Sequence, residues 1–160
     1  MTISLEALSQ QVGAALQSRG YLLATAESCT GGWVAEVVTA TAGSSAWFDR
    51  GFVTYSNQAK QDMLGVSADT LVRHGAVSEA VARDMATGAL RLSHAQAALA
   101  ITGIAGPTGG TPDKPVGTVC LAWALADGKV ESCICHFSGN RETIRRQAVV
   151  EALQGLIRIL

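Results

Sequence analysis

Helical and extended patterns alternate along this chain, and the alternation restricts the fold more than any other feature. Apolar residues recur at three- and four-residue spacing over residues 4–19, which predicts an amphipathic helix. The pattern becomes extended over residues 21–26 and helical again over residues 33–40. A strand between two helices at the start of the chain is typical of a layered α/β protein.

The later segments continue the same alternation. Further strands are expected at residues 50–55, 97–102, 116–126 and 129–138, and further helices at residues 57–64, 68–74, 78–93 and 141–159. Two of these strands, 97–102 and 116–126, are apolar throughout, as in strands that are covered on both faces. Because no repeat or linker interrupts the pattern, we expect one domain over residues 1–160, a three-layer α/β/α sandwich on a mixed sheet.

Polar residues mark where several of these helices begin. Asn57, Ser78 and Asn140 each stand at an expected helix start, where a side-chain oxygen can accept from a free backbone N–H. In the helix that follows Ser78, the spacing indicates that Val81, Met85 and Leu92 face the core.

Composition narrows the range of partners. Of the 160 residues 48% are hydrophobic and 16% are charged, and the formal net charge is −1. This charge gives no field that attracts nucleic acid or an anionic membrane. No apolar run reaches the roughly 20 residues that span a bilayer, and the first residues do not resemble a secretory signal, so we expect a cytoplasmic protein.

The same composition bears on self-association. A low charged fraction and the apolar C-terminal stretch 156–160 suggest surface that is buried between subunits. We therefore expect a homodimer or a higher homo-oligomer. The alternative is that the stretch packs onto the sheet of its own subunit.

Cysteines do not form a familiar metal-binding pattern. The four cysteines are Cys29, Cys120, Cys133 and Cys135. The last two lie two positions apart on an expected strand, without the C-x-x-C spacing of common zinc sites. His136 completes a cluster only if His74 or His94 folds onto it. We therefore interpret the thiols as structural and expect no metal.

Ser28 stands at the corner where the first strand meets the second helix. The stretch Thr25–Gly32 changes from an apolar strand to a turn of small residues. Backbone N–H groups and the positive end of a helix meet at such a corner, where they stabilise an anion. Ser28 is therefore a candidate nucleophile, although this stretch taken alone favours a simple capping role for Ser28 and Thr30.

Lys60 has an unusual position for a lysine. It follows Tyr55 and falls in the first turn of an expected helix, where a cation opposes the helix dipole. If the amine is also desolvated, its neutral form is favoured and it can act as a base. The alternative is an exposed lysine that tolerates a small penalty.

A long loop over residues 103–115 follows an expected buried strand. It mixes flexible glycines with stiff prolines, as a backbone-lined site for an anion does, yet it matches neither a Walker nor a Rossmann motif. A loop of this length in a compact domain is more often functional than a plain connection.

Several blocks of the sequence together resemble the CinA C-terminal domain family. The blocks are TAESCTGG, GSSAWFDRGFVTYSNQAK, GAVSEAVARDMA, ITGIAGPTGG, KPVGTV and GNRETIRRQAV. The resemblance covers essentially the whole chain. It implies hydrolysis of the carboxamide of nicotinamide mononucleotide to nicotinate mononucleotide and ammonia, in pyridine nucleotide recycling, with no cofactor or metal. It does not extend to the N-terminal domain of longer family members.

The resemblance also assigns roles to three residues. It implies that Ser28 is the nucleophile and that Tyr55 and Lys60 complete the catalytic set. An amidase needs a base that later serves as the acid, and we expect Lys60 to take the Ser28 proton directly or through Tyr55.

Substrate contacts are expected from the same corner and from the long loop. The oxyanion donors are expected among the backbone N–H groups of Cys29, Thr30 and Gly31. The expected phosphate contacts come from the 102–110 loop, which includes Thr102, Gly103 and Gly106, or from a helix N-terminus with Arg141 or Arg145. Two other functions stay open: a nucleotide-binding regulatory module without turnover, and an amidase for a different substrate.

Overall fold

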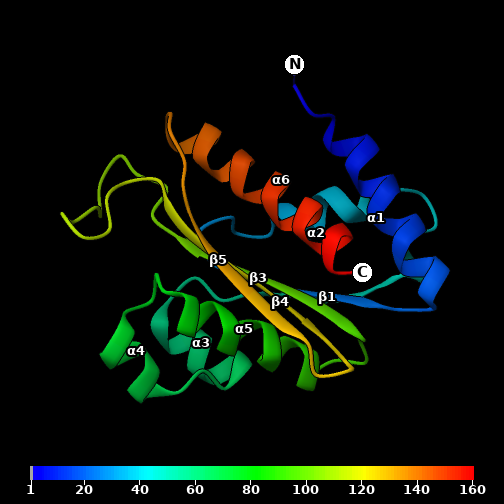
Figure 1. Ribbon diagram of the computed structural model, residues 1–160, viewed down its shortest axis with the longest axis horizontal. Helices are drawn as coiled ribbons and strands as arrows, with labels where there is room; N and C mark the ends of the chain where they lie inside the picture. Colours follow the sequence, from blue (N-terminus) through cyan, green and yellow to red (C-terminus); the bar gives the residue numbers. More distant parts are fainter. Residues whose placement is uncertain (1) are drawn as a thin grey trace.

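The protein is described from a computed structural model that covers residues 2–160 (Figure 1). The strands are β1 (Leu23–Glu27), β2 (Phe48–Val53), β3 (Ala97–Gly103), β4 (Thr118–Leu125) and β5 (Val130–His136). The helices are α1 (Leu5–Arg19), α2 (Trp33–Thr39), α3 (Asn57–Leu64), α4 (Ala68–His74), α5 (Glu79–Arg91) and α6 (Arg141–Ile159), with a short 3-10 turn, η1 (Ser44–Ala46).

The five strands form one mixed sheet in the order β2-β1-β3-β4-β5. β1 runs parallel to both β2 and β3, whereas β4 runs antiparallel to β3 and to β5. Helices α1, α2 and α6 cover one face of the sheet and α3, α4 and α5 cover the other (Figure 1). The expected three-layer α/β/α sandwich on a mixed sheet is therefore confirmed.

Each face of the sheet has its own apolar core. Large side chains such as Leu99, Leu121 and Leu153 fill the core under α1, α2 and α6. On the other face, the strands present mostly alanines, against which Met85 of α5 packs. Both cores are closely filled, so the sheet is a rigid support for the loops at its edges.

The order of the strands determines where a site can form. The chain passes from β1 through α2 to β2 on one side of β1, while β3 lies on the other side. The carboxyl ends of these three parallel strands meet at one edge of the sheet. In open α/β sheets, ligands usually bind in the crevice beyond the carboxyl ends of the strands, at the point where the following strands are added on opposite sides of the first.

Two expectations about helix ends were wrong. Ser56, and not Asn57, caps α3, with its hydroxyl accepting from Ala59 N at 3.0 Å. Helix α5 ends at Arg91, and Leu92 is 43% exposed because it lies past the last helical turn.

The C-terminal stretch packs within its own subunit. Leu156 and Ile159 are buried in the core under α6, and Ile157 and Leu160 pack against it. This stretch therefore gives no support for an interface between subunits. None of the helices in residues 2–160 is long and apolar enough to cross a membrane.

Candidate active site

Ser28 is the first residue after β1 and is held by backbone contacts. Its N–H donates to Ile101 O of β3 at 2.9 Å, and its carbonyl accepts from Gly31 N at 3.0 Å. Gly31 and Gly32 have φ values of +59° and +105°, in the left-handed region that favours glycine. The small-residue turn therefore fixes Ser28, 7% exposed, at the carboxyl edge of the sheet.

A buried carboxylate holds this turn against α2. Glu27 accepts from Thr30 Oγ1 at 2.6 Å, from Val34 N at 2.9 Å and from Ala35 N at 3.1 Å. The carboxylate thus satisfies free N–H groups at the helix start, where its charge is also favoured by the helix dipole. Sequence reasoning missed Glu27, although an acidic residue at the end of an otherwise apolar strand, a few residues before a helix, is the signal that identifies it.

Lys60 reaches the Ser28 hydroxyl from the next strand-to-helix connection. Its Nζ lies 3.0 Å from Ser28 Oγ and donates to Thr54 O at 3.1 Å. Thr54 N in turn donates to Glu27 O at 2.8 Å, which continues the pairing of β2 with β1. The backbone that aligns the two strands therefore also aligns the amine with the hydroxyl.

The surroundings of Lys60 favour its neutral form. The side chain is 1% exposed, and burial lowers the pKa of its amine. No carboxylate in residues 2–160 forms an ion pair with it. A Cys29 thiolate would raise the pKa of Lys60, but burial raises the pKa of that thiol to about 11, so it is protonated at neutral pH. Lys60 is therefore suited to accept the Ser28 proton.

Two of the three backbone N–H groups expected to bind an oxyanion have no acceptor within residues 2–160. Neither Cys29 N nor Thr30 N donates to an acceptor within residues 2–160. Gly31 N, the third expected donor, is occupied by Ser28 O. The N–H groups of Cys29 and Thr30 are therefore the two donors of the turn that remain for a ligand.

Arg145 holds the turn from α6. Its Nε donates to Cys29 O and its Nη2 to Thr30 O, both at 3.1 Å, and its guanidinium lies over the Trp33 ring. The C=O and N–H of a trans peptide point in opposite directions, so anchoring Cys29 O turns Thr30 N–H away from Arg145. The structure therefore places Arg145 on the backbone of the turn.

Arg141 and Tyr55 meet at the rim of the site. Arg141, the first residue of α6, donates from Nη1 to Gly106 O at 2.7 Å and from Nη2 to the Tyr55 hydroxyl at 3.1 Å. Tyr55 is 62% exposed. Within the described residues, the Tyr55 hydroxyl bonds neither to Ser28 nor to Lys60. Of the three expected catalytic residues, the structure therefore brings only Ser28 and Lys60 into contact.

A cavity of about 280 Å³ lies above Ser28. Its lining comes from the Ser28 turn, from the start of α3 and from the β3–β4 loop, and it includes Ser28, Cys29, Tyr55, Asn57, Lys60, Thr102, Gly103, Gly106, Thr108 and Arg141. Thr102 directs its hydroxyl to Ala76 O, at 2.9 Å. Thr30, Gly31 and Arg145 instead line a neighbouring hollow that Arg141 also borders.

Cys29 borders the cavity, whereas the group of possible metal ligands in the described residues does not. The Cys29 thiol is protonated and buried, so it is a poor nucleophile. In residues 2–160, the one group of three metal-ligating side chains is Cys133, Cys135 and Glu151, which does not border the cavity.

The sequence and the fold of this chain are similar to those of known proteins. The model of the CinA C-terminal domain matches residues 5–160. The chain belongs to the CinA C-terminal domain family. The nicotinamide-nucleotide amidohydrolases PncC of Shigella flexneri and Escherichia coli K12 are each 59% identical to it over 149 residues, covering 93% of this chain and 90% of each relative.

Other members of the CinA C-terminal domain family are longer or have solved structures. A CinA-like protein of Syntrophobacter fumaroxidans is 54% identical over 97% of this chain, which covers 36% of that protein. The crystal structure of the competence/damage inducible protein CihA of Agrobacterium tumefaciens is 46% identical, with a TM-score of 0.95 and 99% of each chain covered.

Proposed function

We propose that this chain hydrolyses the carboxamide of nicotinamide mononucleotide, giving nicotinate mononucleotide and ammonia in pyridine nucleotide recycling. The observation that carries the proposal is the buried contact of 3.0 Å between Ser28 Oγ and Lys60 Nζ, with no carboxylate paired to the amine within residues 2–160. The support from relatives is the 59% identity to the PncC amidohydrolases, which extends over nearly the full length of both proteins.

The first step forms an acyl-enzyme. Neutral Lys60 Nζ takes the proton from Ser28 Oγ as the oxygen attacks the carboxamide carbon. The charge that develops on the carbonyl oxygen is stabilised by the N–H groups of Cys29 and Thr30. The C–N bond then breaks, and the Lys60 ammonium returns its proton to the departing nitrogen, which leaves as ammonia.

The second step releases the product. A water molecule attacks the ester carbon and transfers a proton to Lys60 Nζ. The bond to Ser28 Oγ breaks, and the Lys60 ammonium returns a proton to the serine. Nicotinate mononucleotide is released as the carboxylic acid, which loses its proton to solvent to give the carboxylate, and both side chains regain their starting states.

The nucleotide phosphate is assigned to the rim of the cavity. Arg141 is the guanidinium that borders the cavity, and Thr108 and Gly109 of the β3–β4 loop lie on the same lining. An arginine bound to a carbonyl and a phenol can exchange these partners for a phosphate, which is a stronger acceptor. Arg145, whose donors hold the turn, is not assigned to the phosphate.

Measuring ammonia release tests the proposal. Purified protein is incubated with nicotinamide, its riboside or its mononucleotide, beside the Ser28→Ala variant. We expect ammonia from the mononucleotide only, and none from the variant, which still binds the nucleotide. Binding without ammonia release would indicate a regulatory nucleotide-binding module. Release from another carboxamide alone would indicate an amidase for a different substrate.

The remaining features of the proposal concern the molecule as a whole. Residues 1–160 act as one amidohydrolase domain in the cytoplasm, as a homodimer or a higher homo-oligomer. Its partner is a small nucleotide, with no nucleic acid and no membrane involved. The reaction uses no cofactor, because the Ser28–Lys60 pair with two backbone donors supplies the nucleophile, the base, the acid and the oxyanion contacts.

A further inference from the structure

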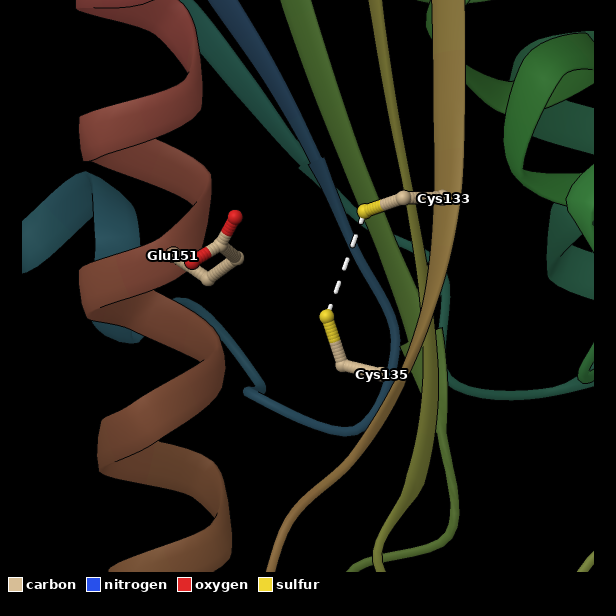
Figure 2. A group of neighbouring side chains, drawn as sticks. All are labelled: Cys133, Cys135 and Glu151. Carbon is tan, nitrogen blue, oxygen red and sulfur yellow. Dashed lines mark hydrogen bonds between the residues drawn. The ribbon is translucent and has the colours of Figure 1, made fainter.

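Three side chains with metal-ligating atoms face one another away from the catalytic cavity. Cys133 and Cys135 project from β5 toward α6, and Glu151 projects from α6 toward the two sulfurs (Figure 2). The sulfurs lie 3.9 Å apart, and the three ligand atoms lie within 4.8 Å of one another. All three residues are half-buried, so solvent can reach them.

We propose that Cys133, Cys135 and Glu151 bind one zinc-class divalent cation that ties β5 to α6. This site is separate from the proposed amidase chemistry and takes no part in it.

The spacing of the sulfurs matches tetrahedral coordination. Two Zn–S bonds of about 2.3 Å at a tetrahedral angle place the sulfurs about 3.8 Å apart. The observed separation is 3.9 Å, so the thiols need little rearrangement to share an ion. A carboxylate oxygen and a water molecule complete four ligands, as in zinc sites that keep one open position.

The secondary structure explains how a C-x-C pair can serve here. Residues two apart on a strand point to the same face, so Cys133 and Cys135 form a pair without a turn. His136, the third ligand considered from the sequence, alternates to the opposite face of β5. The third ligand comes instead from Glu151, on the helix packed above this face of the sheet.

Binding a cation here would change the charge state of the two thiols and leave one carboxylate oxygen free to act as a ligand. Glu151 Oε1 accepts from Arg158 Nη2 at 3.2 Å, while no hydrogen bond within residues 2–160 reaches Oε2. Burial, followed by the neighbouring Cys135, raises the pKa of Cys133 to about 12, and burial also raises the pKa of Cys135. Both thiols are therefore protonated without an ion, and each loses its proton as its S–metal bond forms.

Binding would strengthen the edge of the sheet. β5 is an outer strand, and its hydrogen-bonded neighbour in the sheet is β4. The full set of ligands, two thiols of β5 and one carboxylate of α6, comes together only in the folded chain. A cation bound by all three therefore stabilises the folded state by mass action.

Titration with Co²⁺ and Zn²⁺ under a non-thiol reductant tests the site. Expected results are one ion per chain, a thiolate-to-cobalt charge-transfer absorption, and displacement of Co²⁺ by Zn²⁺. At about 100-fold excess of Zn²⁺ over its Kd, the Tm should rise by roughly 5–10 °C. The Glu151→Gln and Cys135→Ser variants should each lose at least tenfold in affinity.

Glu131→Gln is the matched control. Glu131 lies two residues before Cys133 on the same face of β5 but is outside the group of three ligands. The Glu131→Gln variant should therefore bind Zn²⁺ and Co²⁺ with the affinity of the parent protein. Glu151→Gln changes one partly exposed side chain and keeps its shape, so it stays informative if the cysteine variant fails to fold. Unchanged affinity in Glu151→Gln, absence of the charge-transfer absorption, or a Cys133–Cys135 disulfide in place of the bound ion would each overturn the proposal.

Discussion

Lys60 is a fully buried amine whose nearest polar neighbours are an uncharged hydroxyl and a backbone carbonyl. No carboxylate within residues 2–160 pairs with this amine, so burial holds the pKa of Lys60 below the roughly 10.4 of a free lysine. A base must be unprotonated to act, so kcat/KM should be low where Lys60 is protonated and should rise with pH through the lowered pKa of Lys60.

Variants of Lys60 distinguish two roles for this residue, a base that accepts a proton and a fixed positive charge that only stabilises the site. Lys60→Arg should lose activity almost as completely as Lys60→Ala, on the order of 10²–10⁴-fold, because arginine cannot release its proton at working pH. Tyr55→Phe is the control, since the structure places that hydroxyl on Arg141; we expect a loss of less than about tenfold. The pH–rate profiles of the variants and the parent measure this. Near-parental activity in Lys60→Arg would show that the base lies elsewhere.

The contact between Tyr55 and Arg141 shows what local pattern reasoning cannot supply. Residues 28 and 60 were predicted to cooperate because each stood at an unusual place in a strand-to-helix connection and because the family resemblance paired them. Tyr55 was assigned a role by the family resemblance alone. Its hydroxyl instead meets a residue 86 positions away, and no spacing rule predicts which way an exposed side chain turns.

At the scale of elements, the turn and α2 depend on the buried carboxylate of Glu27. Glu27→Gln replaces one charged oxygen by an NH₂ group, so one of three donors loses its acceptor. We expect the free energy of unfolding to fall by about 1–3 kcal/mol and kcat to fall with little change in KM. Denaturant unfolding and steady-state kinetics measure the two effects.

Glu36→Gln is the matched control for that change. Glu36 also lies at the beginning of α2, but it is exposed, so its loss should cost less than about 0.5 kcal/mol and leave kcat unchanged. Equal effects in the two variants would mean that the general charge of the helix start matters, and not the bonds that Glu27 makes.

The elements were predicted well where packing imposes a period and less well at their ends. The apolar runs of β3 and β4 identified both strands because both faces are covered. At α3, Ser56 and Asn57 are both good capping residues, and the observed cap is set by where β2 ends. The backbone at Thr54 pairs with Glu27 and Lys60, and that choice depends on a neighbouring strand and not on the local sequence.

At the scale of the whole molecule, the arrangement of subunits is still a prediction. The apolar C-terminus is buried in its own core, so the expectation of an oligomer now rests on the low charged fraction and on the outer strand β2. Val53 and Tyr55, at the end of that strand, are large and exposed. Sedimentation over a range of concentrations should give a mass of two or more chains. A single monomer mass at all concentrations would contradict this.

Ser28 N–H is bonded to β3, whereas the next two amides on the chain donate to nothing within residues 2–160. In deuterated solvent, this difference in hydrogen bonding should appear as a large difference in amide exchange rate between neighbouring residues. The Ser28 amide should keep its proton until the sheet itself opens, while the amides of Cys29 and Thr30 should exchange orders of magnitude faster. An inhibitor that resembles the tetrahedral intermediate should slow only the latter two. Amide-resolved exchange would thus report directly on the two amides that we propose as oxyanion donors.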